Sequence, residues 1–326
     1  MEVLFDHSLD ALVILLLIFG IHLFKNPRTA RWGNQTAALA MITGASLTLY
    51  RNGLLYPELL TGAAAAGAFG GWILAVRTSM LQIPAMIALQ HGAGGLAACL
   101  VAIVELASYS MDKSVAAQSA GIAGLVIGAG TFSGSIVACG KLSGRLRQQP
   151  TVLAHHNAFL VLNGVGVVLL MALGAAAGNP TGFAWLGVTS ILAAVLGVLF
   201  SLRIGGADMP VLISFLNATA GLAAALCGVI LHNRLLIAFG ATVAASGSIL
   251  THIMCRAMNR GLVKVFKGSV AASHSDGFAA IKEVVTSDDL PCKAKNESPK
   301  RVSPLQAAIQ AARDAASVII IPGYGM

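Results

Sequence analysis

Long apolar runs separated by short polar segments form the dominant pattern along this chain. A helix needs about 20 mostly apolar residues to cross the hydrocarbon core of a bilayer. The pattern therefore predicts an all-α polytopic membrane bundle in residues 1–267, with nine transmembrane helices. The predicted spans are Leu9–Phe24, Gln35–Tyr50, Leu59–Val76, Ile83–Ser108, Ala116–Cys139, Ala158–Ala177, Phe183–Leu202, Met209–Leu231 and Leu235–Cys255.

The composition agrees with a membrane protein. Of the 326 residues, 56% are hydrophobic and only 10% are charged, whereas soluble domains carry about 25% charged residues. The 36 glycines favour close approach of helix backbones in lipid. The five cysteines show no CxxC spacing, which argues against a disulfide framework or a metal site. The acidic start, MEVLFDHSLD, indicates a retained first span and not a cleaved signal peptide.

The basic residues alternate between the predicted loops. Odd-numbered loops and the segment after the last span are rich in lysine and arginine, whereas the N-terminus carries acidic residues. The basic set is Lys25, Arg28, Arg31, Arg77, Lys141, Arg145, Arg147, Arg256, Arg260, Lys264 and Lys267. The positive-inside rule then places the N-terminus outside and the C-terminus in the cytoplasm. Because topology explains the net charge of +8, we predict no nucleic-acid partner.

His91 lies near the middle of the fourth predicted span, among three glycines. An ionisable group at that depth is costly and usually faces the bundle interior or a water-filled path. Imidazole binds and releases protons near neutral pH. We therefore interpret His91 as a proton-handling residue, although a histidine that only hydrogen-bonds a neighbouring helix is the alternative.

Other polar residues also lie inside the predicted spans. Asn217 carries an amide that both donates and accepts hydrogen bonds. It could pass a proton with water beside it, gate a histidine, or simply join two helices. Ser135 and the other intramembrane hydroxyl groups are more typical of helix contacts than of function. His155 and His156 are expected at the membrane interface, and His252 is a weaker candidate than His91.

The junction RIGGADMP, Arg203–Pro210, separates two spans with almost no loop. Asp208 is positioned to cap the eighth helix, with Pro210 in its first turn. A carboxylate at the mouth of a proton path is a second interpretation, and the two are compatible.

The composition changes after Lys267. Residues 268–302 are polar and indicate a cytoplasmic linker. A capping box follows at Ser303, and the β-branched run at 317–321 leads into Pro322-Gly323-Tyr324-Gly325-Met326. A strand followed by GxG is how a dinucleotide-binding unit begins. Because the helix, the third glycine and the partner strands are missing, either 303–326 is the truncated start of a Rossmann-like α/β domain or the tail packs in another way.

Five stretches together resemble the beta subunit of proton-translocating NAD(P) transhydrogenase. They are TFSGS (131–135), RIGGADMPV (203–211), LNATAG (216–221), SGSILTHIMCRAMNR (246–260) and IIIPGYGM (319–326), and the likeness runs through the whole chain in order. The resemblance implies a proton-conducting membrane domain joined to a cytoplasmic NADP(H)-binding domain. It also implies an alpha subunit that binds NAD(H), hydride transfer between the two nicotinamides, a dimer of alpha–beta units, and location in a bacterial-type inner membrane.

The resemblance also assigns residues by position. His91, Ser135 and Asn217 match the proton path, and Asp208 matches an acidic residue of the coupling junction. Gly247 and Arg256 match residues of the last span. Gly323, Tyr324 and Gly325 match the opening of the NADP-binding loop.

The chain departs from the family pattern at four alanines and at its end. Ala218 and Ala220 replace hydroxyl residues near Asn217, and Ala85 and Ala120 stand where acidic residues are expected. Because the nucleotide domain is expected to be incomplete, we expect no catalysis by this chain alone. The alternative functions are an orphan proton or cation pathway and an inert fragment of the same fold.

Overall fold

A computed structural model describes residues 2–267, except residues 25, 54–55, 109–113, 154 and 177–181. The chain divides into two compact units, Met1–Ser269 and Val270–Met326. The predicted linker, the predicted nucleotide-binding strand, and Gly323, Tyr324 and Gly325 lie outside the described residues.

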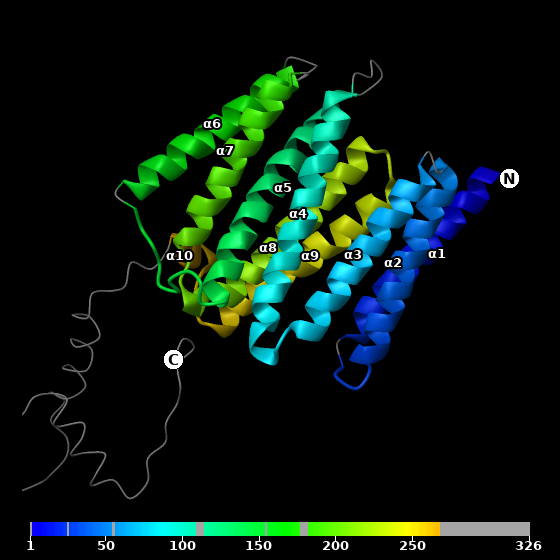
Figure 1. The fold of residues 1–326 in the computed structure, drawn as a ribbon, viewed down its shortest axis with the longest axis horizontal. Coiled ribbons are helices and arrows are strands. Elements are labelled where there is room, and N and C mark those ends of the chain that lie inside the picture. The colour runs from blue at the N-terminus through cyan, green and yellow to red at the C-terminus, as the bar shows by residue number, and fades with distance from the viewer. Residues whose placement is uncertain are drawn as a thin grey trace, which may run out of the picture. The chain divides into compact units, whose positions relative to one another are not determined.

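The described part of the first unit is helical throughout, and nine long helices alternate in direction across the bundle (Figure 1). They are α1 (Glu2–Leu23), α2 (Ala30–Asn52), α3 (Pro57–Arg77), α4 (Ile83–Ala107), α5 (Val115–Leu142), α6 (His156–Ala176), α7 (Phe183–Leu202), α8 (Met209–Ile230) and α9 (Arg234–Ala257). Short 3₁₀ turns, Met80–Gln82 and Gly206–Asp208, precede α4 and α8, and α10 (Leu262–Lys267) follows α9.

Eight of these helices, not the nine predicted, are long and apolar enough to be candidate membrane spans within the described residues. The exception is α2, where Asn34, Gln35 and several hydroxyl residues lower the apolar character. The helix nevertheless has 23 residues and runs beside α1 over a similar length (Figure 1). The number of candidate spans is thus one lower than predicted because of the polar composition of α2, not because of its length.

The longest helix, α5, lies at the centre of the bundle and packs against α4, α7 and α8. Its backbone approaches α4 closely where Gly95 faces Gly128. A Cβ on Gly95 would lie 2.8 Å from the carbonyl oxygen of Gly128, and one on Gly128 would lie 2.6 Å from that of Gly95. Only glycine fits at both positions, so the two helices pack backbone to backbone.

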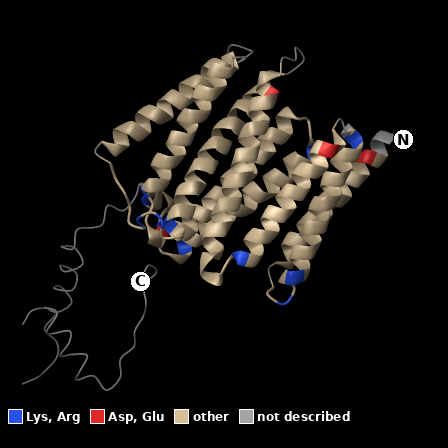
Figure 2. Ribbon diagram, in the orientation of Figure 1, with Lys and Arg blue, Asp and Glu red and all other residues tan. Residues whose placement is uncertain are grey.

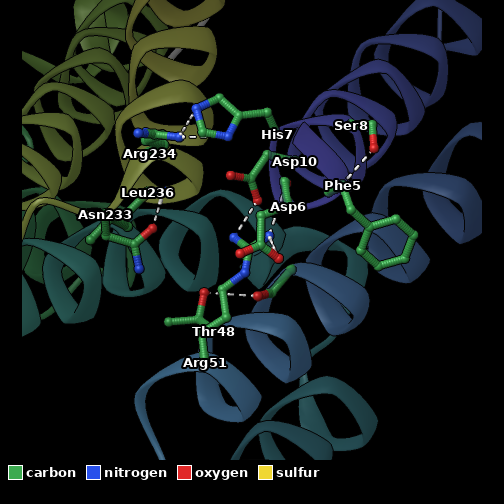
Figure 3. A network of polar contacts seen from close by, with 11 residues as sticks. Phe5, Asp6, His7, Ser8, Asp10, Thr48, Arg51, Asn233, Arg234 and Leu236 are labelled. Atoms are coloured by element: carbon green, nitrogen blue, oxygen red, sulfur yellow. Dashed lines mark hydrogen bonds and ion pairs between the residues drawn. The ribbon is translucent and has the colours of Figure 1, made fainter. Parts of the chain in front are cut away.

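The first three helices are packed in two ways. The pair α1 and α2 makes a close backbone contact, because a Cβ on Gly33 would lie 2.7 Å from the carbonyl oxygen of Gly20. The pair is also joined by Arg51, whose guanidinium donates to Asp10 at 2.6 Å and to Asp6 at 3.3 Å (Figure 3). In α3 no residue is buried, and its glycines, including Gly67 and Gly71, have no atom within 4 Å of an added Cβ.

Charged residues separate between the two ends of the bundle (Figure 2). Most lysines and arginines lie at one end, where α1, α3, α5, α7 and α9 terminate; we call this the basic end. The opposite end carries Asp6, Asp10, Glu58 and Glu105, together with Arg51 and Arg234. The alternation predicted from the loops is therefore present in the fold.

Candidate functional site

His91 and Asn217 come together between α4 and α8. Their side chains lie within interaction distance of each other, and both residues are half-buried. The Nδ1 atom of His91 is buried and has no hydrogen-bond partner among the described residues. The imidazole therefore retains one nitrogen for a proton, a water molecule or another polar group.

Ser135 lies beside the turn of α4 that carries His91. The residue is fully buried, and a Cβ placed on Gly92 would lie 3.0 Å from the Cβ of Ser135. Its Oγ atom also lacks a partner among the described residues. Two buried polar atoms without partners thus lie on adjacent helices, an arrangement that is unusual in folded proteins.

Gly247 positions α9 against the same part of α8. A Cβ on Gly247 would lie 2.7 Å from the backbone nitrogen of Ala218 and 3.0 Å from its Cβ. Ala218 directly follows Asn217. The close contact of the two backbones therefore fixes the turn that presents the Asn217 amide.

Most of the remaining intramembrane hydroxyl groups join helices or bond to their own helix, whereas those of Thr189 and Ser201 on α7 are buried without a partner among the described residues. Thr131 of α5 donates to Thr219 of α8 at 2.9 Å, and Ser133 donates to the carbonyl of Ala194 on α7 at 2.7 Å. Ser248 donates to the carbonyl four residues earlier. The interpretation of these groups as helix contacts is confirmed, and His252 is exposed on α9.

Asp208 lies at the N-cap position of α8, and Pro210 is in the first turn as predicted. The predicted capping bond is wrong, because the side chain makes no hydrogen bond to the helix N-terminus. Instead, the carboxylate is 3% exposed and accepts from Nη1 of Arg260 at 2.9 and 3.1 Å. A guanidinium partner outcompetes a backbone amide for a buried carboxylate.

Arg260 was not selected from the sequence as a site residue, whereas Arg256 was. Arg256 is exposed at the end of α9, and Arg260 follows one turn of chain later, where it reaches Asp208. The sequence CRAMNR places Arg256 and Arg260 four residues apart, so either could face the junction. Only the end of α9 at Ala257 shows which one does.

The start of the segment after α9 is anchored to the bundle. Phe266 of α10 packs edge-on against Phe200 of α7 and Phe215 of α8, with ring centroids 4.9 Å apart in both pairs. Val265 is buried with Val211 and Cys255. The basic ends of α7, α8 and α9 are thus held together by α10.

Two residues assigned to loops or interfaces are buried. Lys141 lies in the last turn of α5 and is 1% exposed, so its interpretation as a solvated loop charge was wrong. His156 is also buried, and its Nε2 contacts the carbonyl oxygen of Leu199 at 3.1 Å. Both side chains compensate carbonyl groups near the end of α7, which have no partners within that helix.

The fold and the site define a polytopic α-helical membrane protein with a half-buried histidine beside an asparagine and an ion-paired junction at its basic end. The sequence profile of the NAD(P) transhydrogenase beta subunit family matches residues 7–326. The chain belongs to this family.

Curated relatives support the same family assignment. The NAD(P) transhydrogenase subunit beta of Rhodospirillum rubrum is 35% identical over 318 residues, which cover 95% of this chain and 65% of the relative. The protein of that name from a named strain of the same species matches equally. The chain thus spans somewhat less than two thirds of the length of these relatives.

Proposed function

We propose that this chain is the proton-translocating membrane part of an NAD(P) transhydrogenase, in which proton movement is coupled to hydride transfer between NAD(H) and NADP(H). The observation that carries the proposal is the pairing of His91 with Asn217 inside the helix bundle, in a chain that belongs to the beta subunit family. Family membership favours this function over an orphan proton or cation pathway.

His91 is the proposed proton carrier. Its imidazole can exchange a proton on either nitrogen, and Asn217 accepts from or donates to one of them. The free Nδ1 and the nearby Oγ of Ser135 are suited to a bound water molecule, which needs two or more polar partners. In this mechanism Asn217 orients the ring and Ser135 stabilises the water on the other side.

Asp208 and Arg260 form the proposed coupling element. Their ion pair joins the start of α8 to the segment after α9, and α10 continues that segment toward residue 268. A change in the cytoplasmic domain that pulls on this segment would shift α8. Because Asn217 lies on α8, the shift would reach the His91 pair.

The nucleotides and partners follow from the family. We propose that NADP(H) binds to the domain that begins within 303–326, where Gly323, Tyr324 and Gly325 open its phosphate loop. NAD(H) would bind to an alpha subunit, and two alpha–beta units would form a dimer. The small-residue surface of α3, which buries no residue, supports packing against a partner helix in the membrane.

The proposed location is a bacterial-type inner membrane, with the N-terminus outside. The gathering of lysine and arginine at the basic end (Figure 2) supports a cytoplasmic position for that end.

The test is a comparison of His91→Ala with His252→Ala in the native membrane complex. We expect proton-coupled hydride transfer to fall about a hundredfold for His91→Ala, the usual contribution of a positioned proton-transfer group. His252→Ala removes an exposed histidine from α9 and should leave the rate unchanged. Full proton coupling in correctly assembled His91→Ala complexes would exclude His91 from the mechanism.

A further inference from the structure

Lys141 is a buried cation whose role is not part of the function proposed above. Its ammonium group donates to the carbonyl oxygens of Ser201, Leu202 and Ile204, at 3.2, 2.7 and 2.7 Å. Within the described residues no carboxylate lies at ion-pair distance from it. A buried charge without a counterion persists only where hydrogen bonds replace its hydration.

The three carbonyls explain how the charge is stabilised. The last carbonyl groups of an α-helix have no partners in the helix, and they carry the negative end of the helix dipole. The ammonium group has three donors and uses all three at the end of α7. Lys141 thus acts as a side-chain cap supplied by a different helix.

The capped segment leads directly to the coupling element. Ile204 is followed by Gly205 and by the 3₁₀ turn that contains Asp208. The backbone N–H of Gly206 also donates to the carbonyl of Gln148 at 2.8 Å, so the segment after α5 holds the junction from a second side. Lys141 therefore fixes one end of a short chain segment whose other end is the Asp208–Arg260 pair.

The same helix carries Ser135 toward the intramembrane site. Gly130, Gly134 and Lys141 follow the helical spacing of one α5 face, and the glycines lie against α7 at Ala193 and Ser201. Six residues separate Ser135 from Lys141, which is about 9 Å along a helix axis. A rigid helix thus connects the neighbourhood of His91 to the clamp on α7.

We propose that Lys141 is a positioning residue for coupling: by holding the end of α7 and the 204–208 segment, it keeps the Asp208–Arg260 pair in register with the Ser135 face of α5. The inference rests on the proposed function. When Lys141 is removed, the junction moves independently of α5, and movement of the segment after α9 is no longer transmitted to the intramembrane pair.

The test uses three variants in the native membrane complex. Lys141→Met removes all donors, Lys141→Gln keeps an amide that can serve part of the site, and Arg147→Met removes an exposed positive charge from the same end of the bundle. Two quantities are measured per assembled complex: the stimulation of hydride transfer by a proton gradient, and hydrogen exchange of the amides in 203–210.

We expect Lys141→Met to lower the stimulation by at least about fivefold, the low end of typical coupling between sites, and to speed exchange in 203–210. Lys141→Gln should be intermediate in both, and Arg147→Met should match the unmodified complex. If Lys141→Met does not assemble, the Gln variant decides the result.

Two outcomes would overturn the inference: unchanged stimulation in assembled Lys141 variants, or reduced stimulation with unchanged exchange in 203–210. Failure of the proposed function is distinguishable, because the unmodified complex would then show no stimulation at all. The exchange measurement would still report whether Lys141 holds the junction.

Discussion

The five helices α4, α5, α7, α8 and α9 pack through their backbones, whereas α3 buries no residue. In the five-helix group, glycines bring carbonyl oxygens within van der Waals distance of the opposing helix, as at Gly95 and Gly128. The pair α1 and α2 repeats this packing at Gly20 and Gly33. Around the candidate site, close backbone packing leaves little freedom to move except through whole helices.

Replacement of glycine by alanine should have opposite effects at the α4–α5 contact and on α3. Gly128→Ala places a Cβ 2.6 Å from a backbone oxygen. Such overpacking should lower the free energy of unfolding by about 2 kcal/mol. Gly67→Ala meets no atom and gains about 1 kcal/mol of helix propensity. Thermal unfolding in detergent measures the stability of both variants. Equal shifts of the melting temperature in the same direction would contradict the difference in packing.

Removal of a carboxylate should distinguish the ion pairs at the two ends. Asp208→Asn leaves Arg260 facing a buried neutral group. We expect the free energy of unfolding to fall by about 2 kcal/mol. This loss is below the usual range for buried ion pairs because the Arg260 side chain is 40% exposed. Asp6→Asn removes a half-exposed carboxylate, which should cost about 0–1 kcal/mol. The free energies of unfolding of the two variants are compared directly. A larger loss for Asp6→Asn than for Asp208→Asn would contradict the conclusion that the buried pair contributes more.

The smallest expected effect concerns hydrogen bonds of threonine. Thr131→Val removes the bond between α5 and α8, for which about 0.6 kcal/mol is typical inside membranes. Thr43→Val removes only a bond to the carbonyl of Leu39 in its own helix and should leave stability unchanged within error. A double-mutant cycle with Thr219→Val isolates the interhelical term; zero coupling would mean that this bond contributes nothing.

Much of the fold followed from the sequence because lipid imposes strong local rules. Apolar length located α4 at Ile83 and α7 at Phe183–Leu202. The many glycines indicated close helix packing, but glycine content does not specify which glycines face a helix of the same chain. Gly95 and Gly128 do, whereas Gly67 and Gly71 do not.

The site was predictable only in part. His91 could be found because an ionisable residue stands out in an apolar run. Arg260 and Lys141 could not be identified from the sequence, since a basic residue near a helix end fits the positive-inside rule whether it is solvated or buried. The spacing of Lys141 from Gly130 and Gly134 was a usable signal, but only once α5 was known to extend to Leu142.

The alternating direction of the nine long helices also determines what must be exported during biosynthesis. In the proposed orientation, the segments between helices that cross the membrane are 53–56, 108–114, 177–182 and 231–233, and all are short. Together they contain one aspartate and one lysine as formally charged residues. Apart from the charged residues at the helix ends on that side, insertion therefore transfers only these two charges through the bilayer. The heavily charged segments at the basic end never need to leave the side on which they are made.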